Sequence, residues 1–317
     1  MSITLMVEQG LAETYARFPS RTHPRMASVE SELRTWFAES EWAEWAGAAG
    51  SVARHRLGEL AARAYPDAAD PLPFAKLLAW MTVVDDVVES PAADHGQAVR
   101  TLPESLVADL PRTSWCGGAP VAVLADLWPD VVGDMAPSWQ RRLRAHVADC
   151  FRVEERWREG RRTNTPPALD AYVAGRREDG VFVVGLDLVE RELGAAVPPA
   201  IFRSDLLREF WAAAADVIVW TNDLLSADRE IAADDSVNLV RVLEACGCSR
   251  ATAVEQAMTM LEKRVREFFD LALQVQCAWP ADEWAAERWV DGMKCTIRGL
   301  YEWSVTTTRY RCEGSEE

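Results

Sequence analysis

The chain has few of the features that mark secreted, membrane or nucleic-acid-binding proteins. Its first residues lack a basic segment followed by an apolar one, and no apolar run approaches the roughly 20 residues of a membrane span. Basic residues are outnumbered, since 34 Lys and Arg against 50 Asp and Glu give a formal net charge of −16. Basic contacts to phosphates dominate affinity for nucleic acids, so this balance argues against such a partner. We expect a cytoplasmic protein with no membrane span.

Cysteine and histidine patterns are equally sparse. The seven cysteines are odd in number and scattered, which fits reduced thiols better than a disulfide framework. The four histidines are too dispersed for a metal cluster. The chain also lacks a Ser-His-Asp order, a glycine-rich phosphate loop and a dinucleotide fingerprint. These absences exclude several common classes of enzyme and direct attention to oxygen-bearing side chains.

Alternating strand patterns are scarce, whereas segments rich in Ala, Leu, Glu and Arg are frequent. Predicted helices cover residues 28–47, 50–65, 72–89, 138–160, 168–193, 200–231, 250–276 and 280–311, with turns rich in Pro and Gly between them. No repeat or shift in composition marks a second domain. We predict one all-α domain over residues 1–317, a bundle of about ten to twelve helices, with flexible ends at about 1–20 and 312–317.

The most informative motif is Asn222-Asp-x-x-Ser226-x-x-x-Glu230. On a helix, its amide, hydroxyl and carboxylate at i, i+4 and i+8 project from one face. Such a set of oxygen ligands suits a hard cation such as Mg²⁺. A chance match is expected only about 0.001 times in a chain of this composition. The alternative is a solvated polar face, but the nearly apolar run at 212–220 just upstream predicts a mostly buried helix whose stripe opens into a cleft.

A second acidic motif follows another apolar run, at 77–84. On a helix, Asp85 and Glu89 are neighbours at i, i+4 and Asp86 and Glu89 at i, i+3, where bare carboxylates repel one another. Next to apolar residues they need cations to stay ionised. An acidic helix end before Pro91 is the alternative, although negative charge there opposes the helix macrodipole. Together with the first motif, the pair predicts a metal site.

Both motifs resemble those of bacterial-type class I terpene synthases. Asp85-Asp86-x-x-Glu89 is similar to their aspartate-rich motif, and the Asn222, Ser226 and Glu230 set to their second metal motif. Arg176, 46 positions before Asn222, resembles their diphosphate-sensing arginine, with Asp179 and Gly180 in the linker and effector positions. Arg309-Tyr310 is similar to their terminal Arg-Tyr pair. The resemblance runs from about residue 20 to 311, with Glu89 in place of the commonest Asp and Arg229 where Lys is frequent.

The resemblance implies a terpene cyclase with a helical barrel, a central apolar pocket and three Mg²⁺ ions. Asp85, Asn222, Ser226 and Glu230 would be the main metal ligands, with Asp86 and Glu89 as further ones. Arg176, Arg229, Arg309 and Tyr310 would donate hydrogen bonds to the diphosphate. That charge stabilises diphosphate as a leaving group and lets the allylic C–O bond ionise. The substrate implied is a prenyl diphosphate, farnesyl before geranylgeranyl, and the resemblance also admits a homodimer.

Below the metals, the implied pocket needs apolar and aromatic walls that stabilise a carbocation. Trp303 resembles an aromatic position of the family, and Trp80, Phe182 and Trp220 are further candidates, although aromatics at helical spacing are more often core residues. Gly180 within a helical stretch indicates a break there. Such a break fits the effector role, in which a backbone carbonyl points at the substrate cation.

Two other functions use the same features. A chain-elongating prenyltransferase shares the helical fold and Mg²⁺, but we expect it to carry two aspartate-rich motifs, and this chain has one. A non-catalytic helical binding protein with a relict site is the third interpretation. The intact ligand set argues against it, because unused buried carboxylates are costly.

Overall fold

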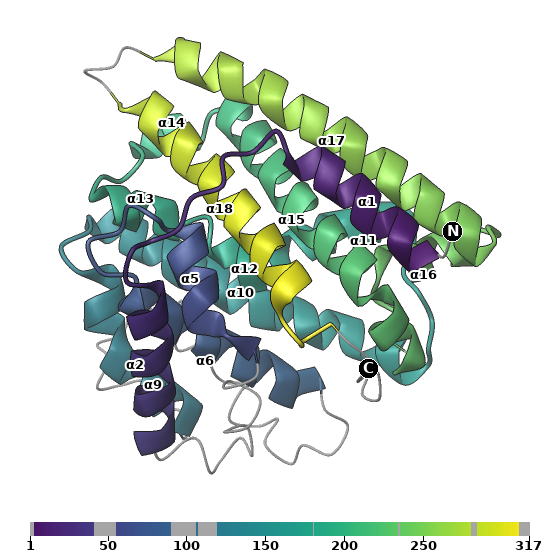
Figure 1. The fold of residues 1–317 in the computed structure, drawn as a ribbon, viewed down its shortest axis with the longest axis horizontal. Helices are drawn as coiled ribbons and strands as arrows, with labels where there is room; N and C mark the ends of the chain where they lie inside the picture. The colour runs from purple at the N-terminus through teal and green to yellow at the C-terminus, as the bar shows by residue number, and fades with distance from the viewer. Residues whose placement is uncertain are drawn as a thin grey trace.

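The computed structural model describes residues 3–40, 55–89, 106, 119–179, 181–233, 235–279 and 284–310, without the side chains at 3–6, 87–89, 119, 154, 155, 158, 159, 179 and 182. These residues form 14 α-helices and no strand (Figure 1). The helices are α1 (Ile3–Tyr15), α2 (Met26–Glu39), α5 (Leu57–Ala64), α6 (Leu72–Glu89), α9 (Ala119–Val132), α10 (Pro137–Arg162), α11 (Leu169–Asp179), α12 (Val181–Val184), α13 (Leu188–Leu193), α14 (Pro199–Phe202), α15 (Asp205–Ala232), α16 (Leu239–Ala245), α17 (Arg250–Ala278) and α18 (Ala286–Thr306). The predicted all-α fold is confirmed.

Several predicted helices begin, end or divide differently. The segment 168–193 contains α11, α12 and α13, and it is interrupted before α13, where the backbone N–H groups of Leu186 and Asp187 bond three residues back and form a turn. The segment 200–231 divides at Ser204, whose side chain accepts a hydrogen bond from the Leu207 N–H and begins α15. The helices α1, α9 and α16 were not predicted. In α9, Pro129 obscures the helical pattern.

Helix α1 lies in the part of the chain for which the sequence predicts a flexible end. Its apolar residues Val7, Leu11 and Tyr15, four positions apart, are all buried. They place one face of α1 on α17 and α15, as Figure 1 shows for α17. The structure thus has a helix in this segment, while the flexible ends and the division of the whole chain into one domain stay predictions.

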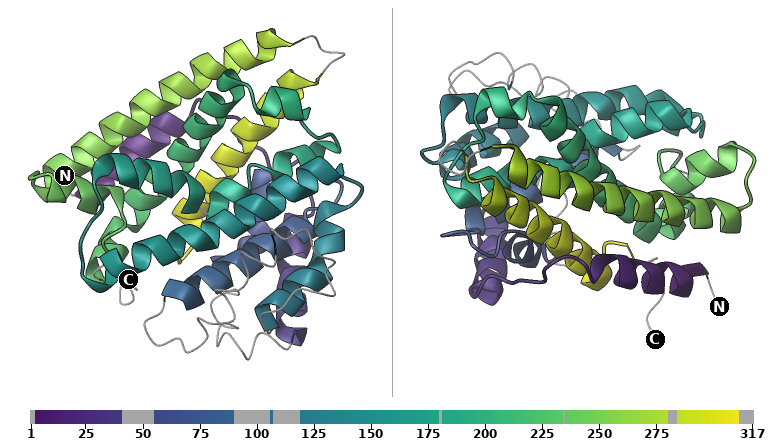
Figure 2. Two further views of the ribbon diagram at one scale, coloured as in Figure 1. Left: turned by 180° about the vertical axis from the view of Figure 1, so that it is seen from behind. Right: turned by 90° about the horizontal axis from the view of Figure 1, so that it is seen from above.

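The two helices that carry the metal motifs lie in different parts of the bundle. Helix α15 packs against α17, α18, α11 and α16, whereas α6 packs against α5, α9, α2 and α12. Seen from behind, α10 runs beside α6 (Figure 2). No helix among the described residues is both long enough and apolar enough to cross a membrane. The bundle thus holds the two motifs on separate helices whose C-terminal ends can face each other.

Candidate metal and diphosphate site

Helix α15 carries the second motif on a segment that is buried before the motif begins. Every residue from Ala213 to Thr221 is buried, as the apolar run predicts. Asn222 and Glu230 are half-buried and Ser226 is fully buried. By contrast, Asp228 is exposed on another face of the same helix. The stripe therefore faces the interior rather than bulk water, in agreement with the predicted buried helix.

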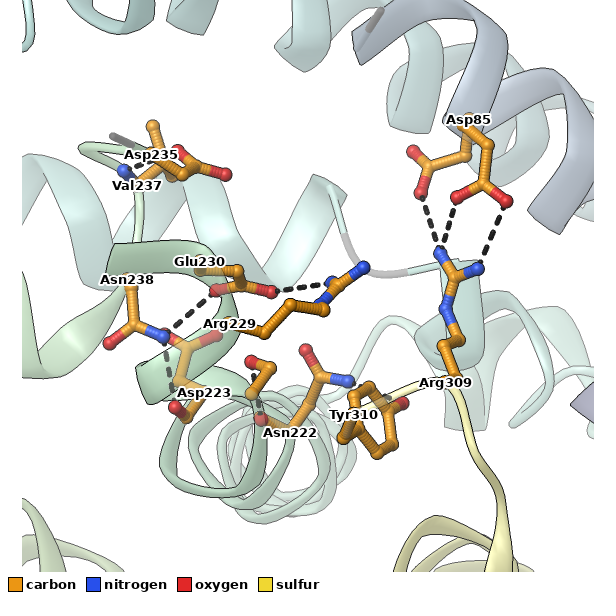
Figure 3. Close-up of polar contacts among 12 residues, drawn as sticks. Asp85, Asn222, Asp223, Arg229, Glu230, Asp235, Val237, Asn238, Arg309 and Tyr310 are labelled. Carbon is orange, nitrogen blue, oxygen red and sulfur yellow. Dashed lines mark hydrogen bonds and ion pairs between the residues drawn. The ribbon is translucent and has the colours of Figure 1, made fainter. Parts of the chain in front are cut away.

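Each residue of the stripe already has a hydrogen-bond partner (Figure 3). The Asn222 amide nitrogen donates to the Tyr310 hydroxyl at 2.7 Å, and the Ser226 hydroxyl donates to the Asn222 carbonyl oxygen at 2.8 Å. One Glu230 carboxylate oxygen accepts from Arg229 at 3.2 Å. These bonds leave lone pairs on the Asn222 amide oxygen, the Ser226 hydroxyl and Glu230, since each of these oxygens can hold more than one partner.

The C-terminal Arg309-Tyr310 pair joins the two motifs. Arg309 binds the Asp86 carboxylate through two nitrogens, at 3.0 and 2.7 Å, and lies 4.0 Å from an Asp85 oxygen. Its neighbour Tyr310 accepts the hydrogen bond from Asn222. Burial lowers the pKa of Arg309, but the two aspartates outweigh that effect and raise it, so the guanidinium stays charged. The terminal pair thus brings the α6 carboxylates and the α15 amide to one site, as Figure 3 shows for Asp85 and Asn222.

Arg176 lies beside Asn222, held by a buried carboxylate that the sequence did not single out. Its guanidinium donates to Asp223 at 2.7 and 3.3 Å and to the Asn222 amide oxygen at 3.3 Å. The Tyr172 hydroxyl and the Leu239 N–H also bind Asp223, which is fully buried. Burial raises the pKa of Asp223 to about 6, against the opposite effect of Arg176. The 46-residue spacing that favoured Arg176 therefore corresponds to a direct contact with the motif helix.

Arg177, the neighbour of Arg176, serves another buried carboxylate. It binds Asp216 through two nitrogens at 2.7 Å each, and Arg264 of α17 binds the same carboxylate at 2.8 Å. Asp216 was visible in the sequence as the only polar residue of the run at 212–220. A lone acid in a buried run predicts a basic partner, but the sequence alone does not name it.

Two of the four pocket aromatics are buried with their indole nitrogens bonded to backbone carbonyls. Trp303 donates to the His55 carbonyl oxygen at 2.7 Å and its ring meets the Tyr310 ring edge-on, 5.9 Å between centroids. Trp80 donates to the Pro120 carbonyl oxygen at 2.8 Å. The Trp220 indole nitrogen is buried and has no hydrogen-bond partner among the described residues. Of these three, Trp303 lies nearest the polar site through Tyr310, and the role of each in lining the pocket stays a prediction.

Four predicted site residues lie wholly or partly outside the described residues. Gly180 lies outside the described residues, so the break predicted at this position stays a prediction. The side chains of Glu89, Asp179 and Phe182 are likewise not described. Their predicted roles as metal ligand, linker and pocket aromatic stay predictions.

The donor set fits a hard cation on chemical grounds. Asn222, Ser226, Glu230 and Asp85 offer oxygen atoms, which are the ligands that Mg²⁺ accepts. Among the described residues, no three or more His, Cys, Asp or Glu side chains converge as a metal-binding group. A soft or borderline metal such as zinc has no matching ligand cluster there. The site is therefore one of mixed amide, hydroxyl and carboxylate oxygens rather than an acidic or thiolate cluster.

One small cavity borders this site. Its volume of about 10 Å³ holds no more than a water molecule, so it is not the pocket for a hydrocarbon chain. It lies between α1, α15 and α18, and its lining residues are Tyr15, Ile218, Thr221, Asn222, Ile297, Leu300, Tyr301 and Ser304. A larger surface pocket of about 650 Å³ lies around Asp70, Lys76 and Arg191 and contains no residue of either motif.

Comparison with known proteins assigns the class. A family profile described as terpene synthase family 2, C-terminal metal binding, matches residues 76–267, which span both metal motifs. The chain belongs to this family. It is an all-α class I terpene synthase, a lyase that acts on prenyl diphosphates, with a metal-binding domain.

Curated relatives and solved structures agree with this assignment. The chain is 27% identical to a pentalenene synthase from Streptomyces avermitilis, over 93% of this chain and 92% of the relative. It is 29% identical to a (+)-T-muurolol synthase from Roseiflexus castenholzii, over 85% and 86%. The crystal structure of germacradien-4-ol synthase from Streptomyces citricolor superposes with a TM-score of 0.78 at 24% identity, over 92% of this chain and 97% of that one, and shows the shared fold.

Proposed function

We propose that the protein is a Mg²⁺-dependent cyclase of farnesyl diphosphate. The observation that carries this proposal is the bridge made by Arg309 to the α6 aspartates and by Tyr310 to Asn222. It supports the proposal because side chains of both motifs meet Arg309 and Tyr310, two proposed diphosphate donors, at one polar site. The (+)-T-muurolol synthase relative is named as cyclising (2E,6E)-farnesyl diphosphate, which supports this substrate before geranylgeranyl diphosphate.

The proposed ligands divide between the two motif helices. Asp85 of α6, with Asp86 and Glu89, would hold metal on one side, and Asn222, Ser226 and Glu230 of α15 on the other. Three Mg²⁺ ions, the number that the family resemblance implies, would neutralise the diphosphate and make it a better leaving group. Among these proposed ligands, Asp86 has both carboxylate oxygens bound by Arg309.

The proposed donors to the diphosphate are Arg176, Arg229, Arg309 and Tyr310. All four are half-buried, so their hydrogen bonds act in a medium of low dielectric where they are strong. Arg229 already lies against Glu230, and Figure 3 shows its side chain reaching from α15 toward the region between the motifs. When the diphosphate leaves, the remaining allylic cation would be confined below it. Asp179 and Gly180, three and four positions after Arg176, would act as linker and effector, with Trp303, Trp80 and Phe182 as proposed aromatic walls.

The first experiment incubates the purified protein with the C10, C15 and C20 prenyl diphosphates, each with Mg²⁺ and with a chelator. We expect diphosphate release and a cyclic volatile product from the C15 substrate, only with Mg²⁺. Product identification by gas chromatography and mass spectrometry separates C15 from C20 activity. Absence of diphosphate release from every substrate contradicts the proposal. Light scattering of the same sample tests the predicted homodimer.

Asn222→Ala is the matching substitution. Loss of a metal ligand should lower kcat at least about 100-fold, equivalent to about 2.7 kcal/mol in the barrier, while the fold survives because no core side chain is removed. Asp228→Ala is the matched control, since Asp228 is exposed on another face of the same helix. Both variants are assayed for diphosphate release and for helical content. Wild-type turnover of Asn222→Ala would rule out Asn222 as a ligand.

A further inference from the structure

We propose that Asn238 is a positioning residue for the carboxylate of Glu230. This inference rests on the proposed metal site and adds a residue outside both motifs. Asn238 precedes α16 directly and is fully buried, in contact with α15 across the turn that follows that helix. Its side-chain amide donates to a Glu230 carboxylate oxygen at 2.9 Å (Figure 3).

All polar atoms of the Asn238 side chain are used. Its amide nitrogen also donates to the Asp223 carbonyl oxygen at 2.9 Å, while its amide oxygen accepts from the Val240 N–H at 2.8 Å and caps α16. These partners determine the orientation of the amide, because the reverse orientation would place its NH₂ group against an N–H and its oxygen against a carboxylate. The orientation of the Asn238 amide is thus fixed by Asp223 and Val240, independently of its hydrogen bond to Glu230.

Glu230 needs such a donor because of where it lies. It falls in the last turn of α15, which ends at Ala232, where the helix macrodipole is unfavourable to a negative charge. Arg229 binds one of its oxygens at 3.2 Å and Asn238 binds the other at 2.9 Å. Glu230 therefore has both oxygens held while lone pairs stay available for a cation.

The turn after α15 is built to bring Asn238 back onto Glu230. The Asp235 N–H donates to the Glu230 carbonyl oxygen at 2.8 Å, and the Asp235 side chain accepts from the Val237 N–H at 2.8 Å. Leu239, the residue after Asn238, donates its N–H to Asp223, the carboxylate that holds Arg176. The start of α16 thus positions a proposed metal ligand and, through Asp223, a proposed diphosphate donor.

Asn238→Ser tests the role without removing the cap. A serine hydroxyl can still accept from the Val240 N–H, but it is too short to donate to Glu230 as well. Hydrogen-bond partners of metal ligands typically contribute 10- to 100-fold to metal affinity. We expect the half-saturating Mg²⁺ concentration to rise by about that factor, both for diphosphate release and for the thermal shift produced by Mg²⁺ with inorganic diphosphate. Asn238→Thr provides a second variant with a capping hydroxyl.

Ser249→Ala is the matched control, because it removes the cap of another helix, α17, where Ser249 accepts from the Thr252 N–H and lies outside both metal motifs. It should lower the unfolding temperature without changing the Mg²⁺ requirement. If the wild type shows neither thermal shift nor release, the proposed metal site fails. If the wild type responds and Asn238→Ser and Asn238→Thr need no more Mg²⁺ than it does, the positioning role is overturned.

Discussion

Arg176 and Arg177 are consecutive residues with separate partners. Arg176 lies against Asp223 and Asn222, whereas Arg177 lies against Asp216, seven positions earlier on α15. Seven residues are about two helical turns, so the two carboxylates share one side of α15. This division leaves Arg176 at the metal motif and assigns Arg177 to the packing of the helices. Two arginines that are neighbours in the sequence therefore make two different contacts in the structure.

Arg176→Lys tests the residue at the site. Lysine keeps the charge but loses the planar fork that binds Asp223 through two nitrogens and reaches Asn222. We expect kcat for diphosphate release to fall about 10- to 100-fold, or about 1.4 to 2.7 kcal/mol in the barrier. Arg208→Lys is the control, since Arg208 is an exposed partner of Asp205 on α15. Unchanged kcat in Arg176→Lys would assign the sensing role to another arginine.

At the scale of the helices, the Asp216 carboxylate of α15 joins that helix to α11 and α17. Its side chain is 1% exposed and it accepts from Arg177 of α11 and Arg264 of α17. A buried carboxylate with two guanidinium partners is costly to break, because the partners lose their charge compensation. The same packing holds Arg176 of α11 beside the metal motif of α15.

Asp216→Asn should therefore lower the free energy of unfolding by about 3 kcal/mol, the size typical of a broken buried ion pair. Urea denaturation followed by circular dichroism measures the change. Glu178→Gln provides the comparison, since Glu178 joins α11 to Arg156 of α10 at an exposed position. Exposed pairs contribute about 0 to 1 kcal/mol. Equal losses in the two variants would mean that burial of Asp216 adds nothing to the contact.

Gly299 allows α18 to approach α5. A Cβ atom at this position would lie 2.4 Å from the Arg63 carbonyl carbon and 2.5 Å from the Ala64 nitrogen, both backbone atoms that have no side-chain freedom to move away. We expect Gly299→Ala to lower the free energy of unfolding by about 2 kcal/mol through overpacking. Gly10→Ala in α1 is the control, because its Cβ would meet only the flexible end of Met258. Thermal and urea unfolding compare the two, and a Gly299→Ala variant as stable as the wild type would show that the helices can separate freely.

At the scale of the whole molecule, a buried charged cluster links α10 to α13. His146 contacts Asp187, which also binds Arg142, and Glu190 accepts from the same arginine. Burial lowers the pKa of His146, but Asp187 outweighs it and the net pKa is raised. Burial raises the pKa of Asp187, but the opposite effect of His146 and Arg142 is larger, so the net pKa is lowered. Burial raises the pKa of Glu190 to about 7.

The sign of the pH effect follows from these directions. A histidine whose folded pKa lies above the usual value of about 6.5 contributes stability that is fully present below pH 6.5 and is lost as pH rises through the folded pKa. We therefore expect wild-type stability to fall as the pH rises above 6.5, and that of His146→Gln to fall less steeply. Both proteins contain Glu190, so its contribution cancels when the pH dependence of stability in His146→Gln is subtracted from that of the wild type. Urea unfolding at several pH values measures it.

His23→Gln is the control for that titration, because the His23 ring accepts from the Arg25 N–H instead of meeting a carboxylate. Parallel slopes in wild type and His146→Gln would contradict the role of the Asp187 contact.

Much of the site could be predicted because its residues lie at helical spacing. The buried run before Asn222, the one-sided stripe of Asn222, Ser226 and Glu230, and the offset of Arg176 are all properties of the order of residues along the chain. The division of 168–193 could not be predicted in the same way, since the turn before Asp187 depends on backbone hydrogen bonds. Asn238 could have been suspected as a helix cap, because an Asn before an apolar segment often begins a helix.

The sequence by itself determined the all-α class, the two motifs and the chemistry of their oxygen ligands, because local spacing decides which side chains share a helix face. Only the tertiary structure decided which long-range partners those side chains meet. Arg309 binds Asp86 across 223 positions, and Tyr310 meets Asn222 across 88. Asp223, a neighbour of the motif, turns inward to hold Arg176 instead of pointing at the site. Such contacts arise from helix packing, which joins segments that no local pattern connects.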